Sequence, residues 1–143
     1  MRAIRHIVEG REVLAVEAGQ TVLDAVSYMT ERVIGAVPVL ENGCVVGMFT
    51  ERDVLTRVVV QQKDPAKSSV SDVMTAEVAF CRPDDDLDNV AAMMRERRIR
   101  HLPVCDEDGQ LRGLISIGDV NAWRAQGQDV TISYLHEYIY GRM

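Results

Sequence analysis

The segment TVLDAVSYMTERVIGAVPV (residues 21–39) recurs 65 residues later, without a gap, as DLDNVAAMMRERRIRHLPV (residues 86–104). The same offset places VLAV (13–16) on VAFC (78–81). After one extra residue in the second copy, GMFTERDV (47–54) falls on GLISIGDV (113–120). Several elements recur in the same order, which makes chance a poor explanation, so the chain contains an internal repeat. The aligned pairs that are identical include Met29 and Met94, Glu31 and Glu96, Arg32 and Arg97, Pro38 and Pro103, and Val39 and Val104.

The sequence pattern of each copy predicts a strand, a helix, two strands and a second helix. The first strand covers residues 13–16, and the helix after it has apolar residues at helical spacing and ends near Val33. AVPVL and VVGMF flank ENG, while LPVC and LRGLISI flank DEDGQ, which predicts a hairpin in each copy. ERDVLTRVVV and IGDVNAWRAQ predict the closing helices. Since proline cannot donate a ladder hydrogen bond, we expect Pro38 and Pro103 at a strand start or on a sheet edge.

The repeat sets the expected domain organisation. We expect a first repeat at 1–62, a linker at 63–72, a second repeat at 73–126 and a C-terminal helix at 127–143. A half of about 60 residues buries little core alone, so the two should pack together around a pseudo-twofold axis. The predicted fold class is mixed α/β (α+β), and the cleft between the repeats is the expected ligand site.

Composition and charge exclude several classes of function. The chain is 47% hydrophobic and 27% charged, which suits a folded core, and its net charge of -6 argues against nucleic-acid binding. No apolar run is long enough to span a membrane. The three cysteines have no metal-ligand spacing, so we expect neither a disulfide framework nor a zinc site. The expectation is a soluble cytoplasmic protein with reduced thiols.

Two copies of a short motif carry the resemblance to a known family. The motif is G-h-h-[ST]-x-x-D, where h is hydrophobic, and it occurs as GMFTERD (47–53) and GLISIGD (113–119). With GAVPV, RHLPV and the two hairpins, it makes residues 8–126 resemble a tandem pair of cystathionine-beta-synthase (CBS) domains, a Bateman module. The resemblance implies two βαββα repeats related by pseudo-twofold symmetry.

The chemistry of the motif allows two readings. A carboxylate can accept hydrogen bonds from both hydroxyls of a ribose, while a hydroxyl and the free amides of a helix N-terminus can hold phosphate. A ribonucleotide would satisfy all these groups. However, [ST]-x-x-[DE] is also a capping box that closes the start of a helix. Both roles are compatible when no ligand is bound.

The resemblance implies two ligand sites in the cleft. The first site would use Leu114, Ser116 and Asp119 with Ile34, Gly35 and Ala36 of the opposite repeat. The second site would use Met48, Thr50 and Asp53 with Ile99. Related modules hold phosphate with a basic residue just before the strand proline, which points here to Arg100 and His101 for the Asp119 site. The first copy has Gly35 and Ala36 at those positions, so Arg52 is the remaining candidate beside Asp53, and a phosphorylated ligand should prefer the Asp119 site.

The expected function is therefore a regulatory module that binds an adenine nucleotide and signals to a partner protein of unknown identity. AMP, ADP, ATP, NAD-type molecules and S-adenosylmethionine all carry the ribose diol, and no further cofactor is required. The alternative is a protein-interaction scaffold whose motifs serve only as helix caps. A small enzyme is a third hypothesis, without support from any catalytic arrangement in the sequence.

Apolar residues on one helix also predict a homodimer. Val54, Leu55, Val58, Val59 and Val60, with Trp123 on the matching helix, are more apolar than a solvated surface requires. Met29, Met93 and Met94 have helical spacing and are expected in the core.

Overall fold

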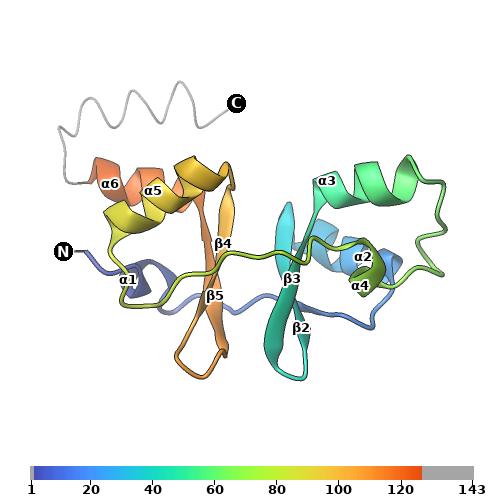
Figure 1. The fold of residues 1–143 in the computed structure, drawn as a ribbon, viewed down its shortest axis with the longest axis horizontal. Coiled ribbons are helices and arrows are strands. Elements are labelled where there is room, and N and C mark those ends of the chain that lie inside the picture. The colour runs from blue at the N-terminus through green and yellow to red at the C-terminus, as the bar shows by residue number, and fades with distance from the viewer. Residues whose placement is uncertain (1, 127–143) are drawn as a thin grey trace.

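Two small sheets lie side by side at the centre of the molecule, with helices at both outer ends (Figure 1). This computed structural model describes residues 2–126. One sheet has the order β1-β2-β3, and the other pairs β4 with β5. The predicted mixed α/β fold with two repeats is confirmed. The strands are β1 (Val16–Glu17), β2 (Ala36–Glu41), β3 (Cys44–Thr50), β4 (His101–Cys105) and β5 (Leu111–Ser116).

The long helices of the two copies occupy matching positions and end alike. They are α2 (Val22–Arg32) and α5 (Leu87–Arg97), and each is followed by a residue in the left-handed region, Val33 or Arg98, with φ 54°. The Thr21 hydroxyl accepts the Asp24 amide at 3.1 Å and so caps α2. The predicted end near Val33 is confirmed. Met29 and Met94 lie in the core as expected, and Met93 packs against it.

The two hairpins are antiparallel, with Val39 opposite Gly47 and Val104 opposite Gly113. Pro103 lies in β4, which has one strand neighbour, β5, in agreement with the expected edge position. The expectation is wrong for Pro38, which lies inside β2. The Met48 amide opposite Pro38 donates outward to the Thr75 carbonyl at 2.9 Å, so proline interrupts no bond between β2 and β3 at this pair.

The first strand of each copy is shorter and later than predicted. β1 begins at Val16 instead of residue 13, and the second copy has only a parallel bridge between Cys81 and Val104 in place of a strand at 78–81. The Ala15 amide donates to the Tyr28 hydroxyl at 3.2 Å instead of to a neighbouring strand. An apolar stretch alone therefore does not place the start of backbone pairing.

The helices after each motif differ in winding. In the first copy α3 (Glu51–Asp53) continues into a π-helix, η1 (Val54–Val59), where the Val60 amide donates to the Leu55 carbonyl at 3.0 Å. The second copy has a regular α6 (Ile117–Ala125). Both helices were predicted, although the π-helical winding was not. The predicted C-terminal helix at 127–143 lies outside the described residues.

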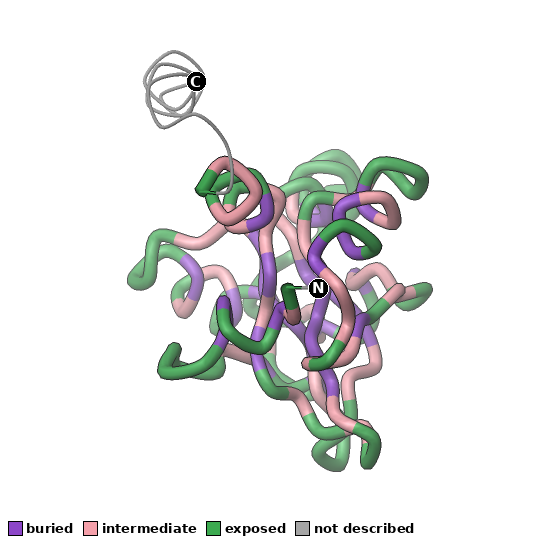
Figure 2. The backbone as a smooth tube through the Cα atoms, turned by 90° about the vertical axis from the view of Figure 1, so that its left-hand side faces the viewer, coloured by how far each residue is buried: buried purple, intermediate pink, exposed green. Residues whose placement is uncertain are grey.

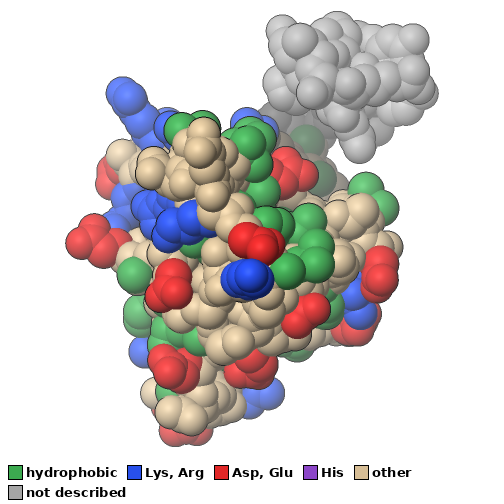
Figure 3. Space-filling view, turned by 90° about the vertical axis from the view of Figure 1, so that its right-hand side faces the viewer, with side chains coloured by type: hydrophobic (Ala, Val, Ile, Leu, Met, Phe, Trp, Pro, Cys, Tyr) green, Lys and Arg blue, Asp and Glu red, His purple; other side chains and the backbone are tan. Residues whose placement is uncertain are grey.

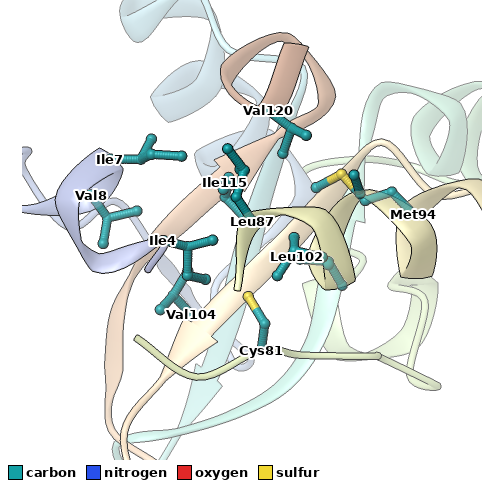
Figure 4. Close-up of a cluster of buried hydrophobic side chains, with 12 residues drawn as sticks. Ile4, Ile7, Val8, Cys81, Leu87, Met94, Leu102, Val104, Ile115 and Val120 are labelled. Carbon is teal, nitrogen blue, oxygen red and sulfur yellow. The ribbon is translucent and has the colours of Figure 1, made fainter. Parts of the chain in front are cut away.

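Two short helices each pack on the copy that they do not precede in sequence. Helix α1 (Arg5–Val8) precedes the first copy, yet Ile4, Ile7 and Val8 pack into the core of the second (Figure 4). Helix α4 (Val70–Val73) lies at the expected linker, yet Val70 and Val73 are fully buried in the core of the first copy. Buried backbone follows both sets of strands, while turns and outer helix faces are exposed (Figure 2). Each core is thus completed by the short helix that precedes the other repeat in sequence.

The motif glycines explain how closely these segments approach. A Cβ at Gly47 would lie 2.5 Å from the Met74 sulfur and 2.8 Å from the Thr75 carbonyl oxygen. A Cβ at Gly113 would lie 3.0 Å from the Val8 Cβ. Any side chain at these positions would push away the segment that closes the core. Packing therefore requires glycine at position 47, while a side chain at position 113 would force Val8 to move by a few tenths of an ångström.

Candidate functional site

A cavity of about 340 Å³ lies between the two copies and contains the second motif. Its size is within the usual range for a small-molecule site. Strand β5 and the start of α6 form one wall, the segment between α2 and β2 forms another, and the chain leading from α1 to β1 passes along it. The lining residues are Val8, Arg11, Glu12, Leu14, Val33, Ile34, Gly35, Ala36, His101, Gly113, Leu114, Ser116 and Asp119.

Both motifs form complete capping boxes. The Ser116 hydroxyl accepts the Asp119 amide at 3.1 Å, and Asp119 Oδ2 accepts the Ser116 amide at 2.9 Å. Thr50 and Asp53 make the same reciprocal bonds at 3.2 and 3.0 Å. These bonds hold each hydroxyl and carboxylate at a helix start. The capping role is thus present in both copies, and the two sites differ in what else reaches the carboxylate.

Arg11 forms a two-pronged ion pair with Asp119 inside the cavity. One guanidinium nitrogen lies 3.0 Å from Oδ2 and the other 2.9 Å from Oδ1. Burial opposes ionisation of Asp119, but hydrogen bonds from Arg11 and Ser116 outweigh it and lower the pKa of the carboxyl below its ordinary value. The Asp119 hydrogen bond also raises the pKa of Arg11. Both groups are therefore charged at neutral pH.

Most residues expected at the Asp119 site meet at this cavity. Leu114, Ser116 and Asp119 from one copy face Ile34, Gly35 and Ala36 from the other, and His101 also lines it. Arg100 does not line this cavity. Its side chain is exposed, and its carbonyl accepts the Ile117 amide at 2.8 Å.

His101 begins β4, directly opposite Ser116. Burial lowers the pKa of its imidazole, and the positive charge of Arg100 lowers it further, while Asp119 acts in the opposite sense. The imidazole is therefore neutral at pH 7, where it can donate or accept one hydrogen bond but brings no full charge to the cavity.

The carboxylate of Asp53 is enclosed by the chain itself. The Thr75 hydroxyl donates to Oδ1 at 3.0 Å, and Arg57 Nε lies 3.8 Å from the same oxygen. Arg57 also donates to the Met74 carbonyl at 2.6 Å, which fixes the segment after α4 over the motif. The Asp53 side chain is 6% exposed, compared with 21% for Asp119. The acceptor that a ribose would need at the first motif is thus already occupied by a protein hydroxyl.

Thr50 is bonded to Asp53, and the other residues expected at this site lie in different surroundings. Met48 is buried, and its backbone pairs with Thr75. Ile99 lines a separate cavity of about 410 Å³, whose lining includes Arg97 but not Met48, Thr50 or Asp53. Arg52 is exposed on α3. Neither this cavity nor the Asp119 cavity contains Met48, Arg52 or Asp53.

Sequence reasoning missed Arg11 and Thr75, although the repeat contains a signal for both. The 65-residue offset that aligns the copies sets Arg11 on Ala76 and Gly10 on Thr75. The two copies therefore differ in charge and in hydroxyl content just before their first strands. The consequence of that difference depends on the tertiary structure, in which α1 packs on the second copy and α4 packs on the first.

A comparison with protein-family models adds the deciding observation. The CBS domain model matches this chain twice, over residues 4–60 and 70–125. The chain belongs to the CBS domain family. The two matched segments include α1 and α4 respectively. A CBS pair is a regulatory module, and stand-alone CBS proteins are generally not catalytic.

Similar proteins include stand-alone CBS proteins. The CBS domain-containing protein YhcV of Bacillus subtilis is 35% identical over 109 residues, which cover 76% of each chain. The mitochondrial CBSX3 of Arabidopsis thaliana is 34% identical over 126 residues, covering 85% of this chain and 61% of CBSX3. A solved CBS-domain protein from Burkholderia ambifaria is 36% identical, with a TM-score of 0.81 over 90% of this chain and 97% of that one.

Two more distant solved CBS structures contain adenosine derivatives. CBSX2 in complex with AMP is 24% identical, with a TM-score of 0.74 over 88% of this chain and 98% of that one. The CBS pair of MJ0100, in complex with 5'-methylthioadenosine and S-adenosylmethionine, is 19% identical, with a TM-score of 0.79 over 90% and 99%. At these identities the likeness establishes a common fold.

Within residues 2–126, no helix has the length and hydropathy that a membrane span needs. In the same stretch, no three histidine, cysteine or acidic side chains form a group that could hold a metal ion.

Proposed function

We propose that this CBS pair is a regulatory module that binds one AMP-like adenine nucleotide at the Asp119 cavity and signals its presence to a partner protein. The observation that carries the proposal is the joint lining of that cavity. Ser116 and Asp119 come from the second repeat, and Ile34, Gly35 and Ala36 from the first. A ligand held by both walls would bias how the repeats sit against each other, which is what a sensor requires.

The cavity chemistry supports a ribonucleotide. Asp119 is an ionised acceptor for the two ribose hydroxyls, and Ile34 and Leu114 offer apolar surface to a base. CBSX2 with AMP and MJ0100 with S-adenosylmethionine provide adenosine-containing ligands to test first. Native mass spectrometry of freshly purified protein tests the proposal directly, because a co-purified ligand would reveal its mass and stoichiometry. One nucleotide per chain supports it. A chain that stays ligand-free and shows no thermal shift with a panel of adenine nucleotides contradicts it.

The ribose contact predicts selectivity for the diol. With 2'-deoxy-AMP one acceptor position of Asp119 would lose its partner, which costs about 1–3 kcal/mol. AMP should therefore bind about 10- to 100-fold more tightly than 2'-deoxy-AMP in calorimetry, with AMP and 3'-deoxy-AMP as the matched comparison. Equal affinities for all three would remove Asp119 from its proposed role.

The scaffold hypothesis remains the second candidate because both motifs form capping boxes and the Asp53 carboxylate is bonded by Thr75. Under that hypothesis Asp119 also serves only as a cap. The module would then bind a partner protein without responding to any nucleotide. The response to a nucleotide panel therefore separates the two functions.

A homodimer is the assembly we propose for this module. Leu55, Val59 and Val60 of the η1 face are 60%, 60% and 69% exposed, and hydrophobic side chains lie among charges of both signs on the side of the first repeat (Figure 3). Val58 is buried and Val54 packs against the core, so neither is free for a partner, and Trp123 packs against the second core. Light scattering at micromolar concentration should give twice the 16.0 kDa chain mass. Leu55→Glu should give the monomer mass, while an unchanged mass for this variant would exclude the η1 face.

A further inference from the structure

Arg11 is held over the ligand cavity by the segment that follows α1. Its amide donates to the Val8 carbonyl at 3.2 Å, and Val8 is buried in the second core. The guanidinium spans both oxygens of Asp119, at 2.9 and 3.0 Å, in the two-pronged geometry that suits arginine and a carboxylate. The side chain remains 45% exposed and can change partners without disturbing the core.

This ion pair competes directly with the proposed ribose contact. Asp119 Oδ2 accepts hydrogen bonds from both Arg11 and the Ser116 amide, while Oδ1 accepts one from Arg11. A carboxylate has about four acceptor positions, so one is left for the two hydroxyls of a ribose diol, which need two. A nucleotide can therefore occupy the cavity only if Arg11 gives up at least part of its pairing with Asp119. The released guanidinium then needs another anion.

The phosphate of the nucleotide is the natural replacement. Within residues 2–126, Arg11 is the one arginine or lysine that lines this cavity. Arg100 is exposed outside the lining, and His101 is neutral at pH 7. Arginine forms two parallel hydrogen bonds with a phosphate as readily as with a carboxylate.

From this geometry we infer that Arg11 is the phosphate-selecting residue of the site, paired with Asp119 in the empty module and with the ligand phosphate in the complex. The inference rests on the proposed function and replaces Arg100 with Arg11 as the phosphate contact. A nucleoside would break the ion pair without supplying a new anion, whereas a nucleotide restores it. The exchange therefore selects nucleotides over nucleosides.

The test measures AMP and adenosine affinities by calorimetry for the wild type, Arg11→Gln and Arg11→Lys. In Arg11→Gln, the ratio of AMP affinity to adenosine affinity should fall about 10- to 100-fold, because the phosphate contact is lost for AMP alone while the competition for Asp119 is removed for both ligands. Adenosine should bind as well as before or better, because nothing competes for Asp119. Arg11→Lys keeps the charge but loses the fork, so its AMP-to-adenosine ratio should be intermediate. Arg5→Gln is the matched control, since Arg5 pairs with Asp84 outside the cavity, and it should leave the ratio unchanged.

Parallel changes for AMP and adenosine in Arg11→Gln, or an unchanged ratio, would overturn the role of Arg11 while leaving the proposed function intact. A fall in the ratio for Arg100→Gln, with none for Arg11→Gln, would return the phosphate contact to Arg100. A wild type that binds neither AMP nor adenosine would instead overturn the proposed function, and the inference with it. Thermal melts of each variant verify that the affinities refer to folded protein.

Discussion

Asp119→Ala is expected to remove most of the affinity for a nucleotide, while Asp53→Ala leaves it nearly unchanged. Hydrogen bonds to a charged group contribute about 1.5–3 kcal/mol each, so the loss of two ribose contacts should weaken AMP binding by about a hundredfold or more. Asp53 is 6% exposed and already accepts the Thr75 hydroxyl at 3.0 Å, so it has little room for a ligand. Calorimetric titration of AMP into each variant measures both effects.

The two variants should have the reverse order of stability effects. Asp53→Ala removes a buried carboxylate, its capping box and the partner of Thr75, and we expect a loss of about 1–3 kcal/mol in the free energy of unfolding. Asp119→Ala removes a more exposed cap and ion pair, so its loss should be smaller. Urea denaturation without ligand measures this difference. Loss of AMP binding in Asp53→Ala, with binding retained in Asp119→Ala, would assign the ligand to the first motif.

Ile4→Ala is expected to destabilise the second repeat by about 2–5 kcal/mol, although Ile4 precedes the first repeat in sequence. Its side chain is 0% exposed, in the same cluster as Leu102, Ile115 and Val120 (Figure 4). Truncation of a buried isoleucine removes apolar burial and leaves a cavity. The urea midpoint of unfolding measures the loss.

Two variants serve as controls for Ile4→Ala. Ile4→Val removes one methyl group and should cost about 0.5–1.5 kcal/mol. Val13 is 46% exposed, so Val13→Ala should change the free energy of unfolding by no more than about 0.5 kcal/mol. A cost for Ile4→Ala no greater than that of Val13→Ala would mean that α1 does not complete the second core in solution.

Local patterns in the sequence predicted most of the repeat architecture. The apolar spacing of Val22, Ala25 and Met29 corresponds to α2, and Asn42 and Gly43 of the predicted turn lie between β2 and β3. The motif residues Thr50 and Ser116 begin helices, as their spacing to an aspartate predicted. These features depend on contacts within a few residues, which sequence patterns record.

The Asp119 site was partly predictable for a different reason. Its residues were predicted from the resemblance to CBS domain pairs, in which the packing of two repeats is already known. Seven of them meet at the cavity: Ile34, Gly35, Ala36, His101, Leu114, Ser116 and Asp119. Arg100 was not among them. Its carbonyl accepts the Ile117 amide at 2.8 Å, but its exposed side chain does not line the cavity.

The sequence by itself determined the repeat, the order of helices and strands and the carboxylate of each motif, because all three depend on local spacing and on the similarity of the two copies. Only the tertiary structure decided how the two sites differ. Arg11 reaches Asp119 across 108 positions, and Thr75 reaches Asp53 across 22. Both contacts arise because α1 and α4 each pack on the repeat that buries their apolar side chains. Burial has no preference for neighbours in sequence, so no local pattern could reveal which carboxylate remains open to a ligand.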